Sequence, residues 1–591
     1  MASLNPPRPN LTLNVGITGH RAHALSDAVV TQLETRIHAC FERLQAAMQA
    51  IASDASSAFS DAPPKLRLHT ALATGADQLA ATEAKKLGYQ VRALLPFPVE
   101  EYRHDFTERD ENREFREHLE AADSYFALPG TREEENHAYV MVGKAVIAAA
   151  DVLIAVWDGK EGNGPGGTAH VIDLALREGV PVLHVPVDRS NDTLGKTRLL
   201  VGGDIVDPEV APIDNEEDLE RLIREVLTPT VEMGLGDLET FFSEIENTFN
   251  PRIEYPLLLA LLGVKKMPPA PWRQTPLAEA LADYKARSGT AFERQALAYE
   301  WANFLAIRYA QLFRGGHITN YTLAALAVLT ALAGLIVPEI KALLVVGELA
   351  IIGLLLFNTK VGSEGGWHRK WLQYRHLAEC LRPLPYLKRT GLVGPPFRNE
   401  HVSASRGRGA VGDWTRWYAA AIWREMPSPD GTMDAAAIRS LADEVIERDV
   451  DGQVAYHRVN AKRMHELDHR LHLVGEIVMT SVIAACGLYL LLNALAPGLL
   501  KHLTYFFVFV TAGFPALGAA VFGMRGHGEH LLAASRSVNT ANSLAVNSEK
   551  LAQVRDIEDL ASELQRTAEI MLADLNEWTV AYSERSLQVP A

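Results

Sequence analysis

The stretch Ile318–Phe357 reads ITNYTLAALAVLTALAGLIVPEIKALLVVGELAIIGLLLF, and the rest of the chain is interpreted around it. No charged residue lies before Glu339, and after Lys341 the apolar run Ala342–Phe357 is interrupted by Glu348 alone. About 20 apolar residues in a helix cross a hydrocarbon layer of about 30 Å. The stretch therefore predicts two membrane-spanning helices, at 318–338 and 342–359. A buried hairpin in a soluble core is the alternative.

A second pair of apolar runs lies downstream and favours the membrane interpretation. The pair covers 475–496 and 503–524, and no charge occurs from 477 to 496 or from 503 to 524. Two such hairpins predict an all-α membrane domain with four transmembrane helices. The average composition conceals these hairpins. The whole chain has 48% hydrophobic residues and a net charge of −16, and these values average a polar N-terminal region with the apolar runs.

Charge and cysteine usage exclude several classes of protein. An acidic chain is a poor candidate for nucleic-acid binding, which needs clustered Lys and Arg for phosphate contacts. Cys40, Cys380 and Cys486 are too far apart for a disulfide framework or a CxxC metal site. The start of the chain, MASLNPPRPNLTLNVG, lacks the basic and apolar parts of a secretory signal. We therefore expect the first domain to be cytoplasmic.

The N-terminal region alternates short segments interpreted as strands with helical patterns. The expected strands are Leu11–Ile17, Leu66–Ala73, Tyr89–Leu95, Val152–Trp157 and Val180–Val187, of which Val152–Trp157 is fully apolar. This alternation predicts a Rossmann-like α/β domain over residues 1–230, with a parallel sheet covered by helices on both faces. Such sheets bind ligands beside the carboxyl ends of their strands.

Three of the expected turns from a strand into a helix carry glycine together with polar residues. Glycine lets backbone N–H groups approach a phosphate, and the following helix adds partial positive charge. A need for positive φ explains any one of these turns, but three at one sheet edge predict a site for a phosphate-bearing ligand. The candidate ligand-binding residues are Thr18, Gly19, His20, Arg21, Thr74, Gly75, Asp77, Gly164, Gly166, Gly167 and Thr168.

The turn after the first strand, Gly16-x-x-Gly19-His20-Arg21, lacks the G-x-G-x-x-G order of a dinucleotide-binding domain, and the pattern G-x-x-x-x-G-K-[ST] is absent from the sequence. The segments Ile17–Arg21, Thr74–Ala80 and Gly164–Thr168 instead resemble the SLOG superfamily, which includes LOG nucleotide hydrolases, DprA-like proteins and the sensor region of TRPM channels. The resemblance covers about residues 10–190. It implies a Rossmann-like domain that binds a nucleotide-derived ligand, ADP-ribose-like or a cyclic nucleotide, without a metal.

The chain departs from the LOG hydrolases in the segment after Thr168. Those enzymes carry P-G-G-x-G-T-x-x-E, whose glutamate takes part in cleaving an N-glycosidic bond, whereas this chain has Val171 there. Asp173 follows on a different face of the expected helix. We therefore expect a binding site without catalytic residues. A membrane-anchored hydrolase and a passive scaffold with a decayed site are the alternatives.

The rest of the chain is expected to connect the sensor to the membrane. Residues 231–282, rich in proline near their end, are interpreted as a linker. A long helix over Asp283–Phe313 is expected to lead into the first span, and residues 283–400 form the first helical unit. Residues 401–591 form the second, which ends in one or two long helices over His530–Glu584.

Basic residues near the ends of the spans predict the orientation. The flanks carry Arg308, Arg314, Lys360, Arg369, Lys370, Arg375, Lys462, Arg463, Arg470, Arg525 and Arg536, whereas the two tips carry only Lys341 and Lys501. We expect a multi-pass protein of the inner (cytoplasmic) membrane with both termini in the cytoplasm.

The helices beside the spans resemble a second family. The segment Lys370–Glu379 after the first hairpin and Glu577-Trp578-x-x-x-Tyr582 near the C-terminus are similar to motifs of SLATT proteins. Those proteins are joined to SLOG domains in bacterial conflict systems. The resemblance implies an anti-phage effector, a homo-oligomeric channel that opens when a nucleotide signal arrives.

Ionisable residues inside a membrane usually face protein or water. Glu348, in the second span, is predicted to face the pore or a partner helix. Glu476 lies at the cytoplasmic mouth of the third span and is a second pore candidate, or an interfacial residue. Pro515 kinks the fourth span, either as a gate hinge or as an ordinary packing kink.

Overall fold

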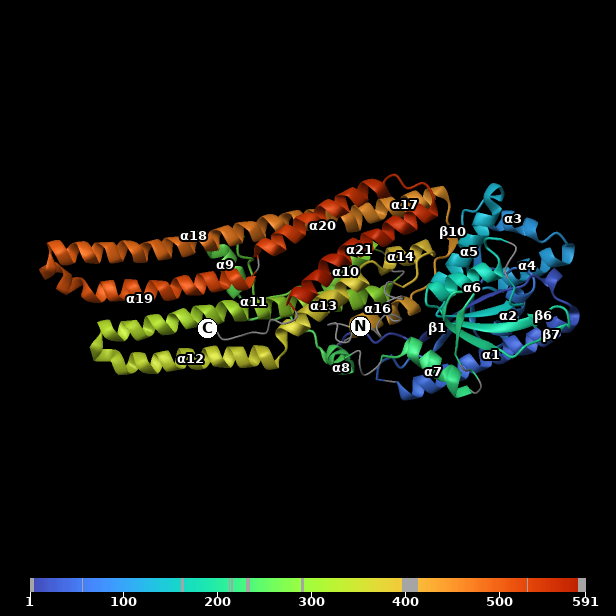
Figure 1. Cartoon of the computed structure of the whole chain (residues 1–591), viewed down its shortest axis with the longest axis horizontal. Helices are drawn as coiled ribbons and strands as arrows, with labels where there is room; N and C mark the ends of the chain where they lie inside the picture. The colour runs from blue at the N-terminus through green and yellow to red at the C-terminus, as the bar shows by residue number, and fades with distance from the viewer. Residues whose placement is uncertain are drawn as a thin grey trace.

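The protein, described from a computed structural model, has an α/β domain at one end and long helices at the other (Figure 1). The sheet lies far from the tips of the two helical hairpins (Figure 1). The structure describes residues 5–55, 57–160, 164–211, 213, 216–229, 234–288, 292–395, 413–528 and 530–582.

The α/β domain is built on one sheet, whose central strand β1 follows the N-terminal segment directly. The order of the strands is β10-β4-β3-β2-β1-β5-β6-β8-β9, and β7 pairs with β6. The chain moves outward from β1 to β4 and then returns to the other side of β1 with β5, so the strand order reverses between β1 and β5. The described strands are β1 (Thr12–Gly19), β2 (Lys65–Thr70), β3 (Gln90–Leu95), β4 (Ser124–Ala127), β5 (Val152–Trp157), β6 (Val182–Asp188), β7 (Thr193–Leu194), β8 (Arg198–Gly203), β9 (Pro208–Ala211) and β10 (Gly431–Thr432).

The prediction of a parallel sheet is correct for the centre and wrong for one edge. Every neighbouring pair from β10 to β6 is parallel, whereas β7 and β8 run antiparallel to β6, and β9 runs antiparallel to β8. A tight turn joins β8 to β9, in which the N–H groups of Val206 and Asp207 each donate to Asp204 Oδ1 over 2.9 Å. Such a turn can join antiparallel strands only.

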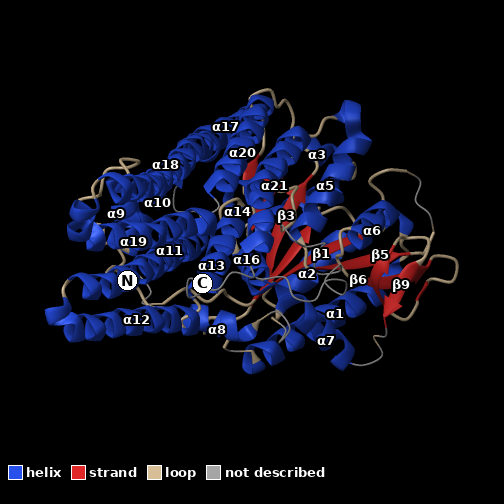
Figure 2. Ribbon diagram, turned by 60° about the vertical axis from the view of Figure 1, so that its left-hand side comes forward, coloured by secondary structure: helices blue, strands red, loops and turns tan. Residues whose placement is uncertain are grey.

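Helices cover both faces of the sheet, as predicted (Figures 1 and 2). One layer contains α1 (Asp27–Asp54), α2 (Ala76–Lys86) and α7 (Glu216–Leu227), and the other contains α5 (Glu135–Ala149) and α6 (Thr168–Arg177). The right-handed crossover of parallel strands puts helices on opposite faces before and after the reversal of strand order. Two helices lie between β3 and β4, namely the short α3 (Val99–Tyr102) and the longer α4 (Arg109–Ala121).

The helical region consists of long helices that pack side by side. Its described helices are α8 (Leu235–Ser243), α9 (Glu254–Leu261), α10 (Leu277–Ser288), α11 (Glu293–Ile336), α12 (Lys341–Glu364), α13 (Trp367–Leu381), α14 (Leu384–Thr390), α16 (Asp413–Glu425), α17 (Ala435–Val445), α18 (Asp451–Leu495), α19 (Pro497–Gly528), α20 (His530–Leu551) and α21 (Ile557–Tyr582). The segment predicted as a linker, 231–282, contains α8 and α9, and Phe241 of α8 is fully buried.

The two regions share one hydrophobic core, which runs from the sheet through α11, α13, α16 and α21. The end of α16 packs beside β1. Next to it, Arg67 Nη1 of β2 donates to the carbonyl oxygens of Arg424 and Met426 over 2.9 and 3.1 Å. Arg424 Nε in turn lies 2.8 Å from Asp151 Oδ1. These buried contacts between distant parts of the sequence hold the α/β domain against the helices.

The predicted long helix over Asp283–Phe313 is wrong in its first part. The structure has two helices there, since α10 ends at Ser288 and α11 begins at Glu293. They fold back on each other, with Lys285 Nζ 2.8 Å from Glu293 Oε1. Phe292, directly before α11, has a non-helical backbone with a φ of −122° and a ψ of 47°, and residues 289–291 lie outside the described part of the chain. The second part is confirmed, because α11 continues through Phe313 into the first apolar run.

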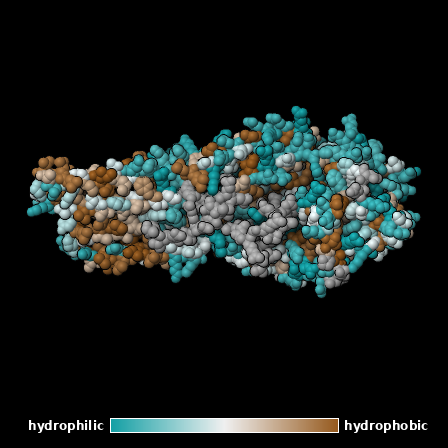
Figure 3. Space-filling model, viewed as in Figure 1, coloured by the Kyte–Doolittle hydropathy of each residue, from teal (hydrophilic) through white to brown (hydrophobic). Residues whose placement is uncertain are grey.

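Four described helical stretches are long and apolar enough to cross a membrane, which suggests a membrane protein. They are Glu293–Ile336, Pro338–Thr390, Ala435–Leu495 and Pro497–Leu551. The second and fourth contain the predicted spans 342–359 and 503–524, and the first and third contain 318–338 and 475–496 except for the last two residues and the last residue, respectively. Large apolar side chains point outward along them, as Leu343 (68% exposed) and Ile483 (71% exposed) do. Hydrophobic surface gathers at this end of the molecule (Figure 3). An apolar surface of this kind suits lipid better than water.

The two hairpins pack against each other through α11 and α19. Gly513 permits their close approach, because a Cβ added there would come within 2.8 Å of Leu329 Cδ2 on α11. Small residues serve this purpose between membrane helices. At the base of the first hairpin, Asn358 Nδ2 donates to Asn320 Oδ1 over 2.7 Å, which joins α11 to α12.

Candidate functional site

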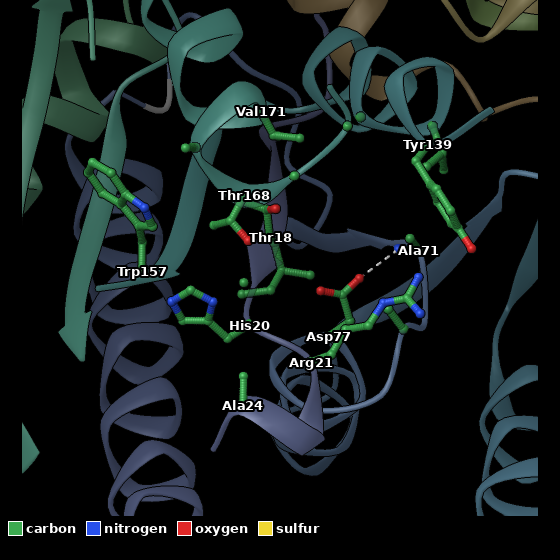
Figure 4. Close-up of a pocket in the computed structure, with 18 of the residues that line it drawn as sticks. Thr18, His20, Arg21, Ala24, Ala71, Asp77, Tyr139, Trp157, Thr168 and Val171 are labelled. Carbon is green, nitrogen blue, oxygen red and sulfur yellow. Dashed lines mark hydrogen bonds between the residues drawn. The ribbon is translucent and has the colours of Figure 1, made fainter. Parts of the chain in front are cut away.

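A pocket of about 430 Å³ opens where the strand order reverses, at the carboxyl ends of β1 and β5. We call it the sheet-edge pocket. Open α/β sheets bind ligands at such a point, because the loops that follow the two strands diverge there. Figure 4 shows side chains from β1, β5, α5 and α6 directed around one space. Of the predicted ligand-binding residues, it brings together Thr18, Gly19, His20, Arg21, Asp77, Gly166, Gly167 and Thr168.

Thr74 and Gly75 lie behind the pocket and shape the turn that carries His20. The N–H of Ala22 donates to Thr74 O, and the N–H of Ala76 donates to His20 O, each over 3.2 Å. Gly75 has a φ of +94°, and an added Cβ would lie 2.6 Å from the nitrogen of Ala22. Only glycine fits there. The two residues therefore support the site and do not line it.

His20 is held as a neutral imidazole at the end of β1. The N–H of Asp158 donates to His20 Nε2 over 3.1 Å, so this nitrogen carries no proton and Nδ1 carries one. Burial lowers the pKa of His20, and the neighbouring Asp158 offsets that effect only in part. The side chain thus offers one N–H donor at the mouth of β1.

Asp158 and Arg189 form an ion pair at the ends of β5 and β6. Burial raises the pKa of Asp158, but hydrogen bonds from Arg189 and from the N–H of Lys160 hold the pKa below its usual value. The carboxylate is therefore charged at neutral pH. Arg189 is 41% exposed and lines the pocket, so part of its guanidinium faces the space where a ligand would lie.

Arg21 is positioned from the opposite side of the pocket. Its Nη2 lies 3.3 Å from Asp105 Oδ2, and its guanidinium carbon lies 5.2 Å from the ring centre of Tyr139. Asp105 also accepts from Tyr139 and from Arg132, whose Nη1 lies 2.6 Å away. Because three donors share one buried carboxylate, Arg21 is oriented without being fully neutralised, and 39% of its side chain stays exposed.

The N-terminus of α6 faces the same pocket. Gly167 is the N-cap and offers no side-chain oxygen, and the first turn has no acidic residue. Gly166 has a φ of +83° and packs against Tyr139, where an added Cβ would lie 2.8 Å from Tyr139 Cβ. Gly164, with a φ of +146°, begins the described part of this loop and lies outside the pocket lining. The first N–H groups of α6 with Thr168 can therefore bind an anion.

Asp77 lies deep in the pocket wall. Its Oδ2 accepts from the N–H of Ala71 over 3.1 Å (Figure 4). The same oxygen accepts from Thr70 Oγ1 over 3.3 Å. Burial raises the pKa of Asp77 to about 7. The side chain therefore braces the turn after β2 and exchanges a proton near neutral pH.

Val171 lies in the first turns of α6, at the position where the hydrolase alternative would need a catalytic glutamate. It is 6% exposed and packs on α5, where a Cβ added to Gly143 would lie 2.9 Å from Val171 Cγ2. Asp173 faces elsewhere, since it accepts from the N–H of Ile205 over 3.2 Å and pairs with Arg177 at 2.9 Å. Neither residue brings a carboxylate into the pocket.

Several residues of the site escaped the sequence reasoning, among them Asp105, Tyr139, Trp157, Asp158 and Arg189. The last three directly follow or end β5 and β6, so the rule that ligands bind at strand ends could have identified them. Asp105 and Tyr139 come from connections on either side of β4, and no local pattern distinguishes them.

The predicted pore residues lie in three different helices. Glu348 is half-buried in α12, and no hydrogen bond or ion pair joins it to another part of the described chain. Glu476 of α18 is 58% exposed, and its Oε1 lies 3.4 Å from His472 Nε2. Pro515 lies inside α19, two residues beyond the contact of Gly513 with α11.

Within the described ranges, no group of three His, Cys, Asp or Glu side chains is arranged to hold a metal ion. Comparison of the chain with protein-family models, with curated proteins and with solved structures finds no match. The arguments about function therefore come from the chain itself.

Proposed function

We propose that the protein is a nucleotide-gated membrane effector. The sheet-edge pocket binds a small nucleotide-derived signal, ADP-ribose-like or a cyclic nucleotide, and several copies of the chain form a pore in the inner membrane that then opens. The resemblance of the sequence to SLOG and SLATT proteins supports this proposal and points to bacterial anti-phage defence.

The pocket chemistry suits a ligand with both phosphate groups and a flat ring. Arg21, Arg189 and the N-terminus of α6 converge on one space and favour phosphate oxygens. Trp157 and Tyr139 offer aromatic surfaces beside them, and His20 adds an N–H donor. Because Val171 replaces the glutamate, this arrangement favours binding over hydrolysis.

One observation carries the link to the membrane, namely that α5 contacts both the sheet-edge pocket and the helical region. Its inner face lines the pocket through Tyr139 and Gly143, and on its other side Lys144 pairs with Glu558 of α21. In turn, α21 packs on α13 and α20, which follow the two apolar hairpins. A ligand that moves α5 therefore changes contacts at the base of both hairpins. The shift from the closed to the open pore is set by how much more tightly the ligand binds the open state than the closed state.

The proposed orientation follows from charge. The basic flanks support a position of the α/β domain and both termini on the cytoplasmic side. The described tips are short, with Pro338–Ile340 joining α11 to α12 and Ala496 joining α18 to α19. Control of the pore is therefore expected from the cytoplasmic side.

The test uses the full-length protein in dye-loaded liposomes and a panel of nucleotides. We expect dye release only with nucleotides that also bind by isothermal titration calorimetry. Chromatography of the same samples detects a released base, which would favour the hydrolase alternative. A nucleotide that binds tightly and never changes leakage or current contradicts the effector proposal.

A further inference from the structure

A second cavity, of about 410 Å³, lies among the helices outside the α/β domain. Its walls come from α9, α11, α13, α18, α20 and α21, so it lies at the base of both hairpins at once. We call it the arginine cavity, because Arg314, Arg375, Arg463 and Arg536 line it.

The charge in this cavity is unbalanced. Of its described lining residues, Glu379 alone is acidic. Glu379 is already paired with Arg375 and, through its other oxygen, with Arg382 Nη1 at 2.8 Å. The positive charges of the other arginines are therefore not balanced by an acidic residue of the lining. Water screens charges less well in this space than on the open surface.

Two of the arginines have no counter-ion among the residues that the structure describes. Arg536 Nη1 is buried and has no hydrogen-bond partner there, and Arg463 makes no ion pair. A buried guanidinium N–H without a partner costs free energy, and so does the approach of like charges. An anion in the cavity would remove both costs.

Arg314 is held in place by aromatic rings. Its guanidinium carbon lies 5.0 Å from the ring centre of Trp371 and 5.2 Å from that of Tyr255. Stacking of this kind orients the planar group and leaves its N–H edge for an oxygen ligand.

We propose that the arginine cavity is a second ligand site, which binds a phosphate-bearing anion and bridges the two hairpins. This site is separate from the sheet-edge pocket, and the argument for it does not depend on nucleotide binding there. Its occupant contacts α11 of the first hairpin together with α18 and α20 of the second. Occupancy therefore stabilises one arrangement of the hairpins relative to each other.

A soluble compound and a lipid headgroup are two sources of such a phosphate. Arg463 lies about 18 Å along α18 from Gly475, where the apolar run begins, at 1.5 Å per residue. The polar layer of a bilayer leaflet is only about 5–8 Å thick. If the apolar runs span the membrane, Arg463 therefore lies beyond the headgroups, and a soluble polyphosphate compound fits the position better than a lipid does.

Isothermal titration calorimetry with inorganic tripolyphosphate tests the site in full-length protein in phosphatidylcholine nanodiscs. All proteins carry Arg21→Gln, which weakens binding at the sheet-edge pocket. We expect binding that the pair Arg463→Gln and Arg536→Gln weakens at least about tenfold, because two charge-assisted hydrogen bonds are lost. The matched control is Arg458→Gln, an exposed arginine of α18 that lines a different groove. Equal loss in this control would overturn the proposal.

Thermal unfolding of the same proteins separates a ligand site from a structural role. Without an anion, the double variant should keep or raise Tm, since it removes like-charge repulsion. A lower Tm would show that the arginines hold the fold and would overturn the proposal. In nanodiscs that contain phosphatidylglycerol, a rise in Tm that the double variant lacks would identify a lipid phosphate as the occupant. No response of the parent protein to either phosphate source would also overturn it.

Discussion

Lys144 of α5 and Glu558 of α21 form an ion pair, with 2.6 Å between Nζ and Oε1, although 414 residues separate them in the sequence. The other oxygen of Glu558 lies 2.9 Å from His137 Nε2, also on α5. The helix that lines the sheet-edge pocket is thereby attached to the helices at the base of the hairpins.

Lys144→Ala should weaken the response to ligand more than it weakens the fold. Both side chains of the pair are more than a third exposed, so the pair contributes only about 0–1 kcal/mol to the free energy of unfolding. We expect ligand-induced dye release to fall while Tm stays nearly constant.

The matched control for this variant is Lys85→Ala, which removes an ion pair of similar exposure inside the α/β domain, with Asp123 at 2.8 Å. It should leave dye release unchanged. The charge swap of Lys144→Glu with Glu558→Lys should restore part of the response. Equal losses in the two alanine variants would rule out a specific role for this contact.

Arg21→Ala should weaken ligand binding by about 1.5–3 kcal/mol, the range for hydrogen bonds to a charged group. Calorimetry on the full-length protein measures this loss. Arg113→Ala is the control, because Arg113 is an exposed arginine of α4 that pairs with Asp110 at 2.8 Å and does not line the pocket. Unchanged affinity in Arg21→Ala would place the ligand elsewhere.

Asp77→Asn should change how stability depends on pH. Burial raises the pKa of Asp77 from 3.8 to about 7, so between these values the folded protein binds more protons than the unfolded chain does. The free energy of unfolding therefore falls as pH rises through this window, by at most about 1.4 kcal/mol per pH unit from this group. Asparagine mimics the protonated acid and lacks this contribution.

The measurement for Asp77 is the difference in Tm between the parent protein and the variant, taken from about pH 4 to about pH 7. We expect the parent protein to lose stability relative to Asp77→Asn as pH rises. Parallel curves would show that Asp77 ionises normally in the folded state.

Gly513→Ala should separate α19 from α11. The new Cβ would lie 2.8 Å from Leu329 Cδ2, and overpacking of this kind costs about 1–3 kcal/mol. Gly487→Ala on α18 is the control, since no atom lies within 4 Å of its Cβ position. Thermal unfolding in detergent should show a lower Tm for the first variant only.

Glu348→Gln should alter ion preference more than Glu476→Gln does, if the four helices form the pore. Glu348 is half-buried near the middle of its apolar run, whereas Glu476 is 58% exposed and paired with His472. A charge at depth acts through a lower dielectric. Reversal potentials in planar bilayers measure the preference, and equal shifts in both variants would count against a pore position for Glu348.

Much of the architecture could be predicted from the sequence, because it depends on properties of continuous segments. A run such as 318–338 is apolar over the length of a membrane crossing, and α11 extends through it to Ile336. The strand-end residues Thr18–Arg21 are also a local signal, since they directly follow the largely apolar segment Leu11–Ile17. Parallel strands bring their carboxyl ends to one edge, so the sequence alone placed these residues beside Gly166–Thr168.

Only the tertiary structure decided which distant residues meet. The pairing of Lys144 with Glu558, the sharing of Asp105 by Arg21, Tyr139 and Arg132, and the addition of β10 to β4 have no local pattern. The arginine cavity likewise takes its charges from four helices. Such contacts follow from the joint burial of apolar faces, which depends on how all the elements pack and not on any one segment.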